Sequence, residues 1–359
     1  MPTNARVAVL RPGSISLSVE EVKLPDPASG QVLVRNLGSG ICYSQLHEMH
    51  AERTQTHLLG HESCGIVEAT GTDVTDVAVG DAVSVTWVAK PGVGSPWRAG
   101  ATLPGGEYAT TDEMVFTWGT HSLVDARYAV PIPVESASDV AAVLGCAVMT
   151  GVGAVMRTAA VPSGASVAVW GAGGVGLSAI VAARLSRAAT IVAVDVAQEK
   201  LDLARDFGAT HVVNATTTDP VAAIHDITAR DGLPPGADYV IDCVASEATL
   251  EAGLLAARRG VTGRLRGGQL VVVGVPNPGV AVSARELLIG HKTATASLGG
   301  RPEVEIPELA DWVARGEIDL AALVTDRYEL DDINQAVADL AAGHIRGRAI
   351  LSFDKRRSP

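Results

Sequence analysis

The sequence predicts an α/β fold in which a doubly wound parallel sheet is combined with a second, β-rich domain. Residues 166–195 carry a buried strand, a glycine-rich turn, an apolar helical pattern and a second strand, in that order. Strand and helix patterns then alternate to about residue 290, which is typical of a parallel sheet with crossover helices. Residues 1–133 instead carry short alternating or valine-rich stretches broken by glycine and proline, as β-strands and turns do. A length of 359 residues also favours two domains.

The elements are expected in the following order. N-terminal strands fall at residues 5–10, 16–22 and 31–37, then a histidine-rich segment at 38–60 and further strands at 65–85 and 127–133. A helical pattern begins after Ser138 and Asp139, whose side chains are suited to cap it. The parallel sheet is expected to use residues 166–170, 190–195, 211–214, 238–244 and 270–275. The chain then carries an apolar stretch at 293–298, helical patterns at 307–318 and 330–343, and a last strand at 348–353.

The glycine-rich turn is a candidate dinucleotide site. Gly171 permits the tight turn, Gly173 lets the backbone approach a pyrophosphate, and Gly176 lets the helix pack close to the sheet. The start of the helix, at Gly174 and Val175, offers free N–H groups and a positive dipole end to the phosphates. Strand, turn and helix together make this pattern far more specific than isolated glycines.

Asp195 ends the second strand of this unit, where a carboxylate accepts hydrogen bonds from the adenosine ribose hydroxyls. A negative charge there repels a 2′-phosphate. The sequence therefore predicts NAD, rather than NADP, as the cofactor.

Four further segments carry a resemblance to a known family. They are GICYSQLH at 40–47, GHESCGIVEATGTDVTDVAVGD at 60–81, LGCAVMTGVGAV at 144–155 and GHIRGRAILSF at 343–353. Together with the glycine turn, the chain resembles the zinc-containing medium-chain alcohol dehydrogenases over nearly its whole length. The resemblance implies a GroES-like, partly barrel-like catalytic domain of residues 1–147 and 290–359. It also implies a Rossmann domain of residues 148–289, with the reaction in the cleft between the two.

The resemblance singles out Cys42, His61 and Cys146, called here the metal trio, as ligands of a catalytic zinc. Two thiolates and one imidazole form a soft, mixed donor set that suits zinc. Three protein ligands leave the fourth position open, which is the arrangement of a catalytic rather than a structural site. Glu62 matches a carboxylate beside the metal, as an occasional ligand or as a partner of the ligands.

The same resemblance assigns roles in proton transfer and cofactor binding. Ser44 and His47, called here the relay pair, match a hydroxyl and a histidine that carry the alcohol proton outward, and imidazole exchanges protons near neutral pH. The cofactor contacts it implies are Thr150 on the nicotinamide, Lys200 near the adenosine ribose and Arg346 at the pyrophosphate.

Three departures from the family pattern stand out. Gln45 occupies the place of an aspartate that orients the zinc-bound histidine, so we expect weaker metal binding. Residues 82–129 contain no cysteine, so we expect no structural zinc, and a proline- and glycine-rich loop at 90–106 stands in its place. Tyr43 replaces a basic or small residue and, with Trp87, is expected to line an aromatic substrate pocket.

The amino-acid composition limits the kinds of molecule that the protein is expected to bind. The net charge is −12, from 28 basic and 40 acidic residues, which argues against nucleic acids and anionic membranes. The N-terminus lacks a signal-peptide pattern and no apolar run is long enough to span a bilayer, so we expect a cytoplasmic protein. The stretch at 293–298 is expected to be an edge strand that pairs with its copy in a homodimer, with a tetramer as the alternative.

The sequence therefore predicts an NAD-dependent alcohol dehydrogenase with one catalytic zinc, which interconverts a small-molecule alcohol and its aldehyde or ketone by hydride transfer. Two alternatives stay open. A zinc-free NAD(P)H-dependent reductase of activated C=C or C=O bonds is favoured by Gln45 and opposed by the metal trio. A non-catalytic dinucleotide-binding protein would leave the relay pair without a role.

Overall fold

The computed structural model describes residues 2–353, apart from residues 93, 96–97 and 112–113. The chain divides into two compact units, Met1–Met149 with Arg301–Pro359, and Thr150–Gly300. The sequence places the second boundary at residue 290, but strand β16 (Thr293–Ala296) pairs in parallel with β15 (Gln269–Val272) and so belongs to the second unit. Part of the expected loop at 90–106 (residues 93, 96 and 97) lies outside the described residues. No helix in the described part of the chain is long and apolar enough to cross a membrane.

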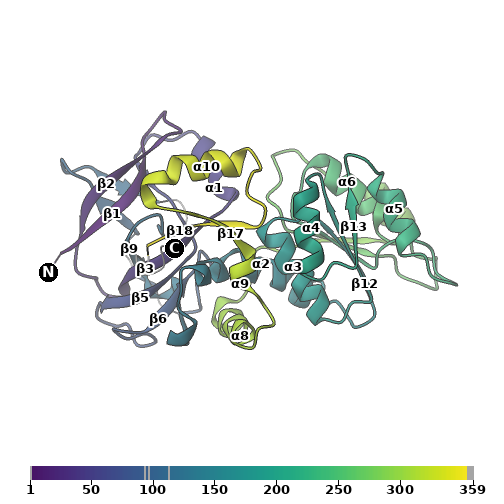
Figure 1. The fold of residues 1–359 in the computed structure, drawn as a ribbon, viewed down its shortest axis with the longest axis horizontal. Helices are drawn as coiled ribbons and strands as arrows, with labels where there is room; N and C mark the ends of the chain where they lie inside the picture. Colours follow the sequence, from purple (N-terminus) through teal and green to yellow (C-terminus); the bar gives the residue numbers. More distant parts are fainter. Residues whose placement is uncertain (1, 93, 96–97, 112–113, 354–359) are drawn as a thin grey trace. The chain divides into compact units, whose positions relative to one another are not determined.

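The first unit contains two sheets, and the larger one combines strands from both ends of the chain (Figure 1). Near the C-terminus, β18 (Arg348–Ser352) pairs antiparallel with β3 (Gln31–Ile41). The smaller sheet runs in the order β2 (Leu17–Leu24), β1 (Thr3–Leu10), β4 (His57–Leu58), β8 (Tyr108–Thr110) and β7 (Gly100–Thr102). The larger runs in the order β10 (Ala129–Ile132), β6 (Ala82–Val85), β5 (Ser63–Thr70), β3 (Gln31–Ile41), β18 (Arg348–Ser352) and β17 (Val324–Tyr328), with β9 (His121–Asp125) paired to β3.

Helices close this unit around an apolar core. Helix α10 packs Ile333 and Ala336 with Ile41, Trp118 and Leu351, and Figure 1 shows it above the strands. Trp118 is therefore a core residue whose indole N–H donates to the Gly40 carbonyl at 3.0 Å. The α-helices of the unit are α1 (Ser44–His50), α8 (Pro302–Ala314), α9 (Leu320–Leu323) and α10 (Ile333–Ala341). Its short 3₁₀ segments are η1 (Ala126–Tyr128), η2 (Val134–Ser136), η3 (Val140–Gly145) and η5 (Leu330–Asp332).

The cysteine-free segment after β6 is held by charged side chains. The Lys90 ammonium, which is buried, donates to Asp76 and to a backbone carbonyl of β10, each at 2.5 Å. Further along, the Ser95 N–H donates to the Asp125 carboxylate at 2.6 Å, and Arg127 donates to the same carboxylate at 3.0 Å. The Asp125 side chain is 5% exposed and that of Arg127 28%, so salt screens this pair less than it would a fully exposed one. We call these contacts the charged clasp.

The second unit is a six-stranded parallel sheet in the order β13, β12, β11, β14, β15 and β16. The central strands of this sheet are apolar along their length because helices cover both of its faces. Helices α3 and α4 lie on one face, and α5 and α6 lie on the other (Figure 1). The strands not yet given are β11 (Ser166–Trp170), β12 (Thr190–Asp195), β13 (His211–Asn214) and β14 (Tyr239–Asp242). The helices are α3 (Gly174–Leu185), α4 (Gln198–Asp206), α5 (Pro220–Ile227), α6 (Glu247–Ala256) and α7 (Ala284–Gly290), preceded by α2 (Ala147–Gly153) and the π-helical η4 (Ala154–Thr158).

The order of these strands determines where a ligand binds. The order is that of dinucleotide-binding sheets, and the direction in which strands are added reverses between β11 and β14. Sheets of this kind bind their ligands at the carboxyl ends of the strands at this point. The glycine turn follows β11 at this point, so the fold brings the predicted cofactor motif to the expected edge of the sheet.

Candidate metal and cofactor sites

The metal trio converges in the first unit from three separate segments. Cys42 follows β3, His61 lies between β4 and β5, and Cys146 lies between η3 and α2. Their ligand atoms all lie within 4.8 Å of one another and all three residues are buried. A tetrahedral zinc ion with its usual bond lengths separates its ligand atoms by roughly 3.3–3.8 Å, so only small side-chain shifts would be needed.

A hydrogen bond couples the two thiols of the trio. A hydrogen bond from the Cys146 thiol holds the pKa of Cys42 well below its usual value, with help from the nearby Arg348 charge. The same hydrogen bond, together with burial, raises the pKa of Cys146 well above its usual value. The Ser44 hydroxyl donates to the Cys42 sulfur at 3.2 Å.

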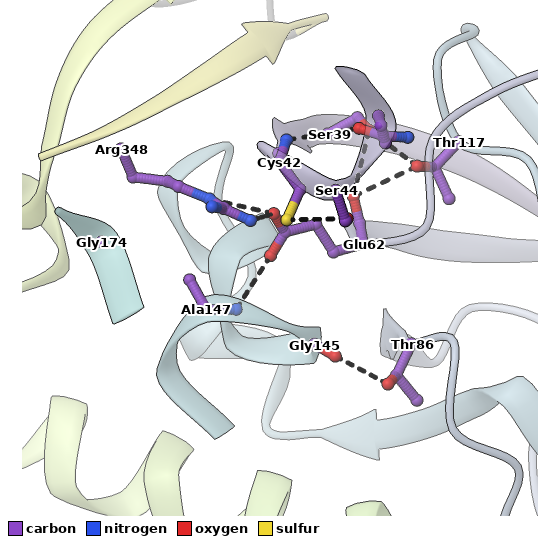
Figure 2. Close-up of polar contacts among 12 residues, drawn as sticks. Ser39, Cys42, Ser44, Glu62, Thr86, Thr117, Gly145, Ala147, Gly174 and Arg348 are labelled. Atoms are coloured by element: carbon purple, nitrogen blue, oxygen red, sulfur yellow. Dashed lines mark hydrogen bonds and ion pairs between the residues drawn. The ribbon is translucent and has the colours of Figure 1, made fainter. Parts of the chain in front are cut away.

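A buried ion pair, Glu62 with Arg348, lies beside Cys42, the member of the trio that Figure 2 labels. The Arg348 guanidinium donates to Glu62 Oε1 through Nη2 and, at 3.1 Å, through Nε. The other carboxylate oxygen accepts from the Ala147 N–H at 3.3 Å, so Glu62 links the segment after Cys146 to the first residue of β18. The Glu62 side chain is fully buried and Arg348 nearly so. The sequence pointed to Glu62 but not to Arg348.

The charges of this cluster fit a divalent cation. With both thiols ionised, the two sulfurs, Glu62 and Arg348 together carry two negative charges in a buried environment. Uncompensated buried charge is strongly unfavourable, and a 2+ ion neutralises the cluster completely. The donor set is also the one that zinc prefers. The trio therefore fits zinc in both chemistry and charge.

Backbone contacts fix the segment that carries His61. The Glu62 carbonyl accepts from the Gly40 N–H and the Ser39 hydroxyl, each at 3.0 Å, and the Thr117 hydroxyl lies 3.2 Å from the same carbonyl (Figure 2). The Ser39 and Thr117 hydroxyls also bond one another at 2.8 Å. The sequence analysis missed both hydroxyl residues. Thr117 lies far from the motifs along the chain, and Ser39, directly before the segment 40–47, carries no signal of its own.

Helix α1 presents the residues at which the sequence departs from the family pattern. The Gln45 amide is buried, its oxygen accepts the Cys42 N–H at 3.2 Å, and its nitrogen has no hydrogen-bond partner among the described residues. Tyr43 and His47, one helical turn apart, place their rings edge to face with centroids 5.7 Å apart. Both rings are exposed, whereas Trp87 is half-buried. The Gln45 oxygen is therefore engaged with the backbone of Cys42, a predicted metal ligand.

The glycine turn has the shape that a pyrophosphate site requires. Gly171 has φ 84°, and a Cβ on Gly176 would lie 1.7 Å from the Gly171 carbonyl oxygen. The N-cap residue of α3 is Gly173, which offers no side chain to the first N–H groups, and the space beside its Cα is open. Gly174 and Val175 begin the helix. Free N–H groups at a helix start bind phosphate oxygens.

Asp195 is more than a candidate ribose contact. One carboxylate oxygen accepts the Ala172 N–H of the glycine turn at 2.7 Å. The other accepts the next two backbone N–H groups, of Val196 at 2.8 Å and Ala197 at 3.0 Å. A carboxylate has about four acceptor positions, so one remains for a ribose hydroxyl.

The remaining predicted cofactor residues differ in exposure. The Thr150 hydroxyl is buried and has no hydrogen-bond partner among the described residues, as expected of a group reserved for a ligand. Lys200, on α4, is half-buried and Arg346 is exposed, whereas Arg348 is the buried arginine of that segment. The roles assigned to Thr150, Lys200 and Arg346 stay predictions.

A dinucleotide-type sheet together with a buried Cys2His cluster fits a metal- and nicotinamide-dependent dehydrogenase. The comparisons agree. The chain matches the family models described as an alcohol dehydrogenase GroES-like domain at residues 28–134 and as a zinc-binding dehydrogenase at 174–315. It is 31% identical to S-(hydroxymethyl)glutathione dehydrogenase of Synechocystis sp., over 92% of this chain and 95% of that protein.

Two solved structures agree in fold. An alcohol dehydrogenase zinc-binding domain protein from Burkholderia ambifaria has a TM-score of 0.89 at 30% identity, over 98% of this chain and 99% of that one. Benzyl alcohol dehydrogenase from Acinetobacter calcoaceticus has a TM-score of 0.84 at 30% identity, with the same coverage. The chain belongs to the zinc-type medium-chain dehydrogenases. It is an oxidoreductase that acts on alcohols with zinc and a nicotinamide cofactor, as the sequence analysis predicted.

Proposed function

We propose that this enzyme is an NAD-dependent alcohol dehydrogenase with a single, catalytic zinc. The observation that carries the proposal is the metal trio, buried and converging beside a Glu62–Arg348 pair whose charges a divalent ion balances. Three protein ligands leave a position for the substrate oxygen. When bound, zinc supplies Lewis-acid polarisation of that oxygen.

The chain's own residues supply proton transfer. The Ser44 hydroxyl lies beside the Cys42 sulfur, where it is placed to accept the proton of a bound alcohol. His47, exposed on the same helix, is placed to exchange that proton with water, since imidazole exchanges protons near neutral pH. Glu62 and Arg348 keep the charge around the trio fixed while the proton leaves.

The cofactor preference follows from Asp195. Its carboxylate lies at the end of β12 with one acceptor position unused by the backbone, which supports recognition of a ribose diol. A 2′-phosphate would bring like charges together at that point. We therefore propose NAD rather than NADP.

The named relatives guide the choice of substrate. They act on benzyl alcohol and on S-(hydroxymethyl)glutathione, so aromatic alcohols come first among candidates. Trp87, half-buried, and Tyr43, which is 55% exposed, are the aromatic side chains that we propose for the pocket wall.

Assembly and location follow from the surface and the cysteines. β16 forms one edge of its sheet, and nearby Leu298 is 74% exposed, which supports pairing of this edge with a second copy in a homodimer. A dimer of dimers would give the tetramer. All four cysteines are free thiols, which supports a reducing compartment such as the cytoplasm.

A zinc-free reductase of activated C=C or C=O bonds is the second candidate. The observation in its favour is Gln45, an uncharged amide whose oxygen already binds the Cys42 N–H and adds no negative charge beside the trio. This candidate retains the nicotinamide site and makes the metal trio dispensable.

One experiment separates the candidates. Zinc per chain and NADH turnover on aromatic, aliphatic and polyol alcohols and carbonyls are measured for wild type, Cys42→Ala and Cys64→Ala. Cys64 is the matched control because it is equally buried but outside the metal trio, and burial raises its pKa to about 12. We expect about one zinc per chain in wild type and Cys64→Ala, with metal and turnover lost together in Cys42→Ala. Full turnover by metal-free Cys42→Ala would support the reductase instead, and NAD binding without turnover would support a binding protein.

A further inference from the structure

Thr86 contacts the residue before a metal ligand. It follows β6, is fully buried, and its hydroxyl donates to the Gly145 carbonyl at 2.6 Å (Figure 2). The same hydroxyl oxygen accepts the Val88 N–H at 3.3 Å. One side chain therefore connects the end of η3, directly before Cys146, to the turn that carries Trp87.

The two segments pack backbone to backbone at this point. A Cβ on Gly145 would lie only 2.4 Å from the Val85 carbonyl oxygen, so a side chain there would force β6 and η3 apart. Glycine thus permits the close approach that the Thr86 hydroxyl needs. The contact is part of a tight junction rather than a chance surface bond.

The bond bears directly on where the Cys146 sulfur points. The Gly145 carbonyl belongs to the peptide unit that includes the Cys146 N–H, so anchoring it fixes the plane from which the side chain of Cys146 departs. Cys146 lies between two helical segments with φ −138° and ψ −72°, outside helical geometry. The next peptide is held by a longer bond, from the Ala147 N–H to Glu62 at 3.3 Å.

We propose that Thr86 is a positioning residue for the Cys146 thiolate, and that its hydroxyl sets the affinity and geometry of the metal site. The inference rests on the proposed zinc function and deepens it. Partners that hold metal ligands in place contribute about 10–100-fold to metal affinity. Thr86 acts on the backbone of the ligand and never touches the metal.

The test compares hydroxyl deletions at two matched threonines. Thr228 is a close structural control: it is buried, its hydroxyl donates to the Ile224 carbonyl at 2.6 Å, and it accepts one backbone N–H, from Gly236, at 3.1 Å. It lies in the unit that lacks the metal trio. Zinc affinity is measured by chelator competition, and the visible spectrum is recorded after Co²⁺ loading, for wild type, Thr86→Val, Thr86→Ser and Thr228→Val.

We expect Thr86→Val to bind zinc about 10–100-fold more weakly and to shift the Co²⁺ absorption bands, because the thiolate geometry relaxes. Thr86→Ser keeps the hydroxyl and should retain both wild-type properties. Thr228→Val should lower thermal stability while leaving affinity and spectrum unchanged. Wild-type affinity and spectrum in Thr86→Val would overturn the inference and leave the zinc function standing.

Two further outcomes are decisive. If Thr86→Val does not fold, Thr86→Ala and Thr86→Ser replace it, since these differ from one another only by the hydroxyl. Equal metal affinity and spectra in that pair would overturn the inference. A wild-type protein that binds neither zinc nor cobalt would overturn the zinc function itself, and the positioning role with it.

Discussion

Replacing Arg348 by methionine tests the buried ion pair beside the metal trio. The change removes the guanidinium and leaves the Glu62 carboxylate fully buried, with the Ala147 N–H at 3.3 Å as its remaining partner in the described part of the chain. Breaking a buried pair by removing one partner costs about 3–5 kcal/mol, because the other charge stays desolvated. Methionine retains much of the side-chain volume, so the effect is mainly one of charge.

The assay is thermal unfolding of the metal-free protein, because bound zinc would stabilise the folded state by mass action. For a unit of this size, each kcal/mol shifts the midpoint by about 2–4 °C, so we expect a decrease of roughly 6–20 °C. Arg346→Met is the matched control: the same substitution two positions away, at an exposed residue. Its effect should stay within about 0.5 kcal/mol.

Equal unfolding midpoints for Arg348→Met and Arg346→Met would refute this reasoning. A double variant, Glu62→Leu with Arg348→Met, adds a second check. Replacing both charges of a buried pair by apolar groups is often neutral, so the double variant should recover most of the lost stability. A double variant less stable than Arg348→Met would show that the carboxylate does not depend on the guanidinium.

Three further predictions address the cofactor, a buried carboxylate and the metal. Asp195→Ala should increase kcat/KM with NADP relative to kcat/KM with NAD. Both values should fall, because the Ala172 N–H loses its acceptor. A wild type that already prefers NADP would contradict the assignment of Asp195. Burial raises the pKa of Asp242, and one of its oxygens has no partner among the described residues. The carboxyl therefore binds its proton more tightly in the native state than in the unfolded chain, and stability is lost as pH rises through the raised pKa. Asp242→Asn should thus have a larger free energy of unfolding than wild type at pH 7, by about 1–3 kcal/mol. The difference should shrink in melts at a pH below the ordinary pKa of aspartate, and a pH-independent difference would contradict the reasoning. Gln45→Asp should tighten zinc binding about 10–100-fold in chelator competition. Unchanged affinity would show that Gln45 does not weaken the metal site.

Most strands of the parallel sheet and the glycine turn were predictable because their signals are local. Gly171, Gly173 and Gly176 lie within one turn of the chain, and each strand of the second unit appears as a short apolar run. The metal trio comes from distant segments, and only the family resemblance connected Cys42 with Cys146. The resemblance was needed because spacing along the chain says little about contacts between strand ends.

The contacts that the sequence did not reveal depend on where elements begin and how they pack. Arg346 and Arg348 are chemically equivalent in the sequence, and only the start of β18 at Arg348 separates the exposed from the buried residue. The hydroxyls of Thr86 and Thr117 bond backbone carbonyls in other segments. Threonine is common in β-rich sequences for reasons of shape, so nothing in the sequence marks these two.

The charged clasp has a practical consequence for work with this enzyme. Lys90, Asp76, Asp125 and Arg127 secure the segment after β6 through ionic and backbone bonds, with no cysteine in it. If the proposed single zinc at the metal trio is right, chelating agents should remove metal without loosening these contacts. We therefore expect that a coloured or paramagnetic ion can replace the zinc while the charged clasp stays intact. Among the described residues the metal trio is the cluster able to hold such an ion, so its spectrum would report on the proposed catalytic site.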